Sequence, residues 1–82
     1  MTRKKTLPDR IRDVRGNQSQ REFAEKINAV KVGGTAPRSN IHQAAISRYE
    51  RGAVTPSAWT LYRIAQLGNT KMEWLLTGKL AA

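Results

Sequence analysis

The sequence predicts an all-α fold, a compact bundle of five short helices. Apolar residues recur at helical spacing in five segments, and residues typical of turns and helix ends separate those segments. No segment alternates apolar and polar residues opposite a matching partner strand. The chain has 82 residues with 39% hydrophobic content, which suits one small domain and one core. It has no cysteine, so packing must hold the fold together without disulfides or a cysteine zinc site.

The first two predicted helices each have an apolar stripe and a start signal. In the first helix, Pro8 and Asp9 suit the first turn, and Gly16 lies near the end. Its apolar residues recur at i, i+4 and i+7: Leu7, Ile11 and Val14. The second helix begins at Ser19, which forms a capping-box pattern with Glu22, each side chain bonding the other residue's backbone amide. Its apolar stripe is Phe23, Ala24 and Ile27.

A long loop is predicted after the second helix, because from Asn28 to Asn40 the helical period fails and turn-forming residues accumulate. We assign residues 29–40 to this loop. Two interpretations stay open, a solvated loop or a finger that carries Lys31 and Arg38 to phosphate groups.

The third helix is predicted over residues 43–51. Gly52 supplies a left-handed stop, and one face carries the apolar residues Ala45, Ile46 and Tyr49. The fourth helix is expected to open with Thr55 as N-cap and Pro56 at its first position, and to end around residues 68–69. Its predicted core stripe is Ala58, Leu61, Ile64 and Ala65. A last turn or two, closed by Gly78, contains Met72, Trp74, Leu75 and Leu76.

The charge of the chain favours a polyanionic partner. Fifteen Lys and Arg residues stand against six Asp and Glu, for a net charge of +9. Each Lys or Arg that neutralises a phosphate releases counterions, so nucleic acid is the first expectation and an anionic membrane the second.

Arg3, Lys4 and Lys5 lie together without an acid, so we expect residues 1–6 to be a flexible basic arm, residues 7–78 the domain and residues 79–82 a tail. No apolar run is long enough to span a bilayer or to act as a secretory signal, which predicts a cytoplasmic protein.

Nothing in the sequence indicates catalysis. His42, the one histidine, has no evident carboxylate or nucleophile partner, and no glycine-rich phosphate loop follows a strand. We therefore predict no enzyme, no catalytic residue, no metal and no cofactor.

The second and third helices are the parts that a helix-turn-helix requires. The first of the two supports the other, and the second contacts the bases. The backbone amides at the start of the second helix are open to a phosphate at the turn from Ser19 to Arg21, with Gln20 adding a side-chain bond. Such a contact sets the register on a duplex but not the sequence that is recognised.

The segments SQREFAEKI, QAAISRYERG, TPSAWTLYRIA and WLLTG resemble the lambda-repressor-like (XRE/Cro) helix-turn-helix family. The resemblance covers about residues 11–78. It implies a sequence-specific transcriptional regulator, a repressor, that binds double-stranded DNA as a homodimer on a palindromic operator with half-sites about 34 to 36 Å apart. It also implies a bacterial or phage-encoded protein associated with the nucleoid.

The resemblance assigns roles to individual residues. The third helix enters the major groove with the base-contacting positions Gln43, Ala44, Ser47 and Arg48. Expected phosphate contacts are Ser19, Gln20, Arg21 and Arg51, joined by the arm residues Arg3, Lys4 and Lys5. Gln20 and Gln43 are expected to brace one another, and Arg15 and Glu50 to form a structural ion pair between the first and third helices.

The sequence also departs from the family's pattern. The family's turn is only a few residues long, so residues 29–40 are an insertion. His42 replaces a small polar N-cap and weakens the start of the third helix, while Gly68 replaces a leucine, so the fourth helix is expected to fray at its end.

The resemblance implies that the last helix doubles as a dimer contact, and so small a domain cannot bury all of its apolar residues, so we expect a dimer or partner surface. The residues assigned to it are Met72, Leu75, Leu76, Trp59 and Tyr62. Trp59 and Tyr62 are covered by the loop or form a partner patch. The alternative function is accordingly a protein docking module of the same fold, using Trp59, Tyr62 and the 29–40 loop.

Overall fold

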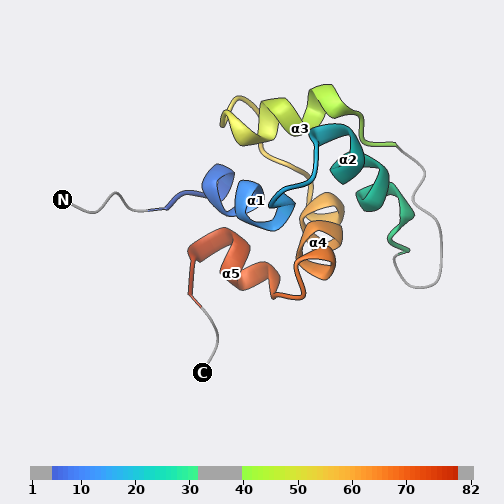
Figure 1. Ribbon diagram of the computed structural model, residues 1–82. Coiled ribbons are helices and arrows are strands. Elements are labelled where there is room, and N and C mark those ends of the chain that lie inside the picture. The colour runs from blue at the N-terminus through green and yellow to red at the C-terminus, as the bar shows by residue number, and fades with distance from the viewer. Residues whose placement is uncertain (1–4, 32–39, 80–82) are drawn as a thin grey trace.

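The computed structural model describes residues 5–31 and 40–79, and its regular structure in these ranges is entirely helical. The elements are α1 (Leu7–Arg15), α2 (Gln20–Ala29), α3 (Gln43–Glu50), α4 (Ala58–Leu67) and α5 (Met72–Thr77) (Figure 1). α3 crosses one end of the bundle against α1 and α2, while α5 lies at the other end against α1 and α4 (Figure 1). The predicted all-α, five-helix fold is confirmed.

One core joins all five helices. Its fully buried members are Ile11, Phe23, Ile27, Ile46, Ile64 and Leu75. Each of these except Leu75 comes from a predicted apolar stripe, so helical periodicity identified the inward faces of α1 to α4. No helix within the described part of the chain is both long and apolar enough to cross a membrane.

The start of α4 differs from the prediction. Ser57, not Thr55, is the N-cap, and its hydroxyl accepts a hydrogen bond from the Thr60 amide at 3.3 Å. Pro56 is buried ahead of the helix instead of occupying its first position. Ala58 was predicted in the core stripe but is exposed, because it is the first residue of the helix and lies outside the packed turns.

The capping box predicted for α2 forms only in part. The Ser19 hydroxyl accepts from the Glu22 amide at 3.1 Å as expected. The Glu22 carboxylate accepts from the Ser19 hydroxyl at 3.2 Å, not from the Ser19 amide. α1 has a full capping box that the sequence analysis did not identify, between Thr6 and Asp9.

The expected fraying at the end of α4 is wrong. The Gly68 amide donates to the Ile64 carbonyl at 3.0 Å, and the Thr70 amide donates to the Ala65 carbonyl at 2.9 Å, so the last turn is capped. A Cβ atom on Gly68 would lie 2.9 Å from a methyl of Val14. Glycine at this position therefore lets α4 approach α1 closely.

Two arginines lie inside the bundle. The Arg10 guanidinium donates to the Leu75 carbonyl at 2.7 Å and to the Leu76 carbonyl at 3.2 Å, where it meets the negative end of the α5 dipole. Arg63 is 1% exposed, and its Nη1 has no hydrogen-bond partner within the described residues. Desolvation lowers the pKa of Arg63, and the nearby Tyr49 acts in the opposite direction.

Candidate nucleic-acid interface

α3 has one face turned outward. Gln43, Ala44 and Arg48 are exposed and Ser47 is half-buried. Ile46, Tyr49 and Glu50 are buried on the other side of the same helix. These two sets follow the helical period, so the small and polar residues form one continuous open stripe. The four positions predicted to contact bases therefore share one accessible face.

The C-terminal end of α3 is held by a charged network around Glu50. Arg15 binds the Glu50 carboxylate through two bonds, Nε to Oε2 at 2.6 Å and Nη2 to Oε1 at 3.0 Å. Arg12 donates to the Glu50 carbonyl at 2.6 Å. The expected ion pair between Arg15 and Glu50 is thus present, and it ties α3 to α1.

Gln20 belongs to the same network. Its Nε2 donates to Glu50 Oε1 at 3.1 Å, which adds α2 to the contacts that hold α3. The bracing expected between Gln20 and Gln43 is wrong, since Gln20 turns to Glu50 and no hydrogen bond joins the two glutamines. The carboxylate attracts the amide more strongly than a neutral glutamine would. Gln20 remains half-buried, with its carbonyl oxygen and a second amide hydrogen still available.

The residues predicted to contact phosphate lie around the start of α2 and the end of α3. Ser19, Arg21 and Arg51 are exposed. The Ser19 hydroxyl is engaged with Glu22, so the amides that follow it are the groups that the start of α2 leaves open. Arg21 pairs with Glu25 at 3.5 Å, but both side chains are largely exposed, so that pair is weak.

The basic arm is described only from Lys5 onward; Arg3 and Lys4 lie outside the described residues. Lys5 Nζ lies 2.7 Å from the Asp13 carboxylate, and the Lys5 carbonyl accepts from Arg10 Nη1 at 2.9 Å. Lys5 therefore contacts α1 and its charge is already paired. Arg38 and most of the predicted 29–40 loop also lie outside the described residues.

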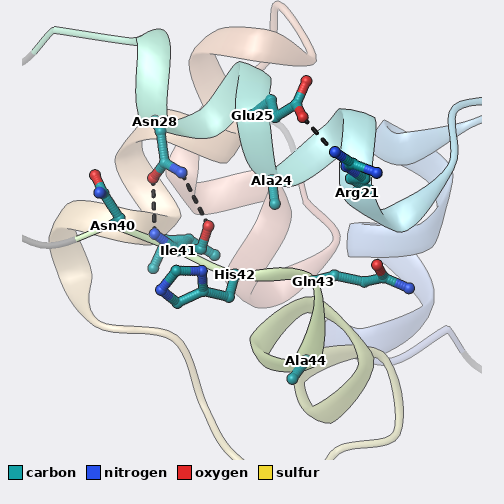
Figure 2. Close-up of a pocket in the computed structure, with 9 residues that line it drawn as sticks. All are labelled: Arg21, Ala24, Glu25, Asn28, Asn40, Ile41, His42, Gln43 and Ala44. Carbon is teal, nitrogen blue, oxygen red and sulfur yellow. Dashed lines mark hydrogen bonds and ion pairs between the residues drawn. The ribbon is translucent and has the colours of Figure 1, made fainter.

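A hollow of about 470 Å³ lies between α2 and the N-terminal end of α3 (Figure 2). Ala24 and Ala44 line it with small side chains, and His42 and Gln43 line it with polar ones. His42 is the N-cap of α3 but makes no side-chain cap bond, as the sequence led us to expect. The Asn28 side chain reaches from α2 to the backbone of Ile41 (Figure 2), a contact that the sequence analysis missed.

The predicted partner surface is only partly on the outside of the bundle. Trp59 is 65% exposed and Leu76 is 49% exposed, while Tyr62 and Met72 are half-buried. Leu75 is fully buried, so its assignment to a partner surface is wrong. α5 turns this residue into the core, where it packs with residues of α1 and α4.

Potential metal ligands are dispersed. Across residues 5–31 and 40–79, no three or more His, Cys, Asp or Glu side chains are grouped so that they could hold a metal ion.

Comparisons with known proteins agree with this geometry. A family model described as Helix-turn-helix matches residues 35–75, half of the chain. An uncharacterised HTH-type transcriptional regulator from Haemophilus influenzae is 32% identical over 68 residues, which cover 77% of this chain and 28% of the relative. The chain thus spans little more than a quarter of the length of that relative.

The fold has a close counterpart among solved structures. The crystal structure of the P22 c2 repressor protein in complex with a synthetic operator matches with a TM-score of 0.69. The match covers 93% of this chain and 100% of that one, at 20% sequence identity. With the match of the family model and the helical geometry described above, the chain belongs to the lambda-repressor-like helix-turn-helix family.

Proposed function

We propose that this domain is a sequence-specific, double-stranded DNA-binding regulator of transcription, a repressor, and that α3 reads the major groove. The open stripe of α3, opposite its buried side, carries the proposal. The Haemophilus influenzae relative is named a transcriptional regulator, and the P22 c2 repressor is in complex with an operator. Neither the family nor the fold is that of an enzyme.

The exposed side chains of α3 suit the edges of bases. Gln43 can pair with adenine through N6 and N7, and Arg48 with guanine through O6 and N7. The Ala44 methyl can pack against a thymine methyl, and Ser47 can bond either kind of edge. Arg48 is exposed and forms no ion pair within the described residues, so its guanidinium is available for such a contact.

Phosphate contacts flank this reading face in the proposal. The amides that begin α2 would bind one phosphate beside Ser19 and Gln20, and Arg21 and Arg51 would add charge. Arg3, Lys4 and Lys5 would follow the duplex; Lys5 would have to exchange Asp13 for a phosphate. Because these contacts do not depend on base identity, they position the reading face.

The proposed assembly is a homodimer on a palindromic operator, with half-sites about 34 to 36 Å apart. In this proposal the dimer interface uses two apolar residues of α5, the exposed Leu76 and the half-buried Met72. The protein would act in the cytoplasm at the nucleoid, encoded by a bacterium or a phage.

Selection of binding sites from a random oligonucleotide pool tests the proposal. The expected result is one enriched sequence with two-fold symmetry, protected in a footprint over two half-sites. If the protein binds all sequences to the same extent, with an affinity that depends only on the salt concentration, sequence-specific recognition is contradicted.

A second candidate function rests on Trp59, a large apolar side chain that is 65% exposed. In this alternative the domain docks to a protein through Trp59, Tyr62 and the 29–40 loop. Trp59→Ala would then abolish capture of the partner and leave DNA affinity unchanged. Under the leading proposal, Trp59→Ala changes neither DNA affinity nor site selection in the oligonucleotide assay.

A further inference from the structure

Asn28 joins α2 to the residue that precedes the cap of α3. Its Oδ1 accepts from the Ile41 amide at 2.7 Å, and its Nδ2 donates to the Ile41 carbonyl at 2.9 Å (Figure 2). The carboxamide has the same donor and acceptor pair as a peptide group, so it bonds Ile41 as a neighbouring strand would. The contact spans thirteen positions along the chain.

α3 has no side-chain cap of its own. Hydroxyl groups cap α2 and α4, from Ser19 and Ser57. His42 provides no such bond to α3. The polar contact nearest the start of α3 therefore comes from the last turn of α2, while Ile41 also packs against the core.

We infer that Asn28 is a positioning residue for base recognition, acting through Ile41 on the N-terminal end of α3. The inference rests on the proposed function. Gln43 lies two residues beyond Ile41. A shift of the backbone at Ile41 therefore moves the Gln43 carboxamide away from the plane of a base. Asn28 keeps the two helices in helix-turn-helix geometry across a connection much longer than the usual turn.

The test compares affinities for the selected site and for unrelated DNA. Asn28→Ala should lower affinity for the selected site about tenfold, since two neutral hydrogen bonds are lost. Affinity for unrelated DNA should change less than about twofold, because phosphate attraction does not require the base readers to be aligned. Asn28→Asp should resemble Asn28→Ala, since it places a carboxylate oxygen against the Ile41 carbonyl.

Asn40→Ala is the matched control. Asn40 lines the same hollow, is exposed and forms no side-chain hydrogen bond with the described residues. Its substitution should leave both affinities at the wild-type level. All affinities are measured well below each variant's unfolding temperature, so that the folded fraction is the same for every protein.

The possible outcomes separate the positioning role from a structural one. If Asn28→Ala lowers the unfolding temperature but keeps the ratio of specific to unrelated affinity, the positioning role is overturned. Hydrogen exchange gives a second measure that needs no DNA: the Ile41 amide should be protected in the wild type and in Asn40→Ala, and exchange at least tenfold faster in Asn28→Ala. Failure of the proposed function would appear in the wild type itself, because no DNA site would be selected. That result would rule out a role of Asn28 in base recognition. Hydrogen exchange would still test the contact between Asn28 and Ile41.

Discussion

The two ends of α3 are held by different chemistry. At the C-terminal end, the buried Glu50 carboxylate receives three hydrogen bonds, from Arg15 and Gln20. At the N-terminal end, one neutral carboxamide, that of Asn28, bonds the backbone of Ile41. Breaking the first contact strands a charge inside the protein, whereas breaking the second loses only neutral bonds. The C-terminal end should therefore dominate stability, and the N-terminal end the placement of the reading face.

The largest expected effect comes from the C-terminal end. Glu50→Gln should lower the free energy of unfolding by about 3 kcal/mol, because Arg15 loses its carboxylate partner. The effect falls at the low end for buried pairs, since the Arg15 side chain is 23% exposed and keeps some contact with water. Urea denaturation measures it. Glu73→Gln, which changes an exposed carboxylate on α5, is the control and should shift stability by less than about 0.5 kcal/mol. Equal effects of the two substitutions would contradict a dominant C-terminal network.

The outward stripe between the two ends should affect binding and not stability. Arg48→Ala should cost about 1 to 3 kcal/mol of discrimination at one base position of the selected site. Affinities for a panel of single-base variants of that site measure it. Arg51→Ala is the comparison, since loss of a phosphate contact should weaken every sequence about equally and reduce the salt dependence. A uniform loss in Arg48→Ala would remove Arg48 from the base-reading set.

The smallest expected effect comes from the missing cap at the N-terminal end. His42→Ser should raise the free energy of unfolding by about 0.5 to 1 kcal/mol, because a hydroxyl can accept from an amide in the first turn of α3. Thermal and urea unfolding measure it. Ser57→Ala, which removes an existing cap from α4, should lower stability by about 1 kcal/mol. If His42→Ser leaves stability unchanged, the missing side-chain cap does not weaken α3.

Much of the site could be predicted because it depends on one helix and one known pattern. The period of α3 places Gln43, Ala44 and Arg48 opposite Ile46 and Tyr49, and the structure exposes the first three. The Arg15 and Glu50 pair followed from the family resemblance and is present.

Two of the errors concern residues for which the sequence allowed two local choices. Thr55 and Ser57 are both good N-caps, and the burial of Pro56 between them placed the start of α4 at the second one. Leu75 and Leu76 are adjacent apolar residues on a short helix. Only the contacts of α5 with α1 and α4 show that the first is core and the second is exposed.

The sequence by itself determined the five helices, the direction of the apolar faces of the first four and the positive charge of the domain. These properties depend on periodicity, end residues and composition, which act within a few positions of the chain. Only the tertiary structure decided that Gln20 bonds Glu50, that Arg10 binds the carbonyls at the end of α5, and that Asn28 holds Ile41. Each of these side chains has several possible partners along the chain. Which one it meets depends on how the helices pack, because the partners lie thirteen or more positions apart.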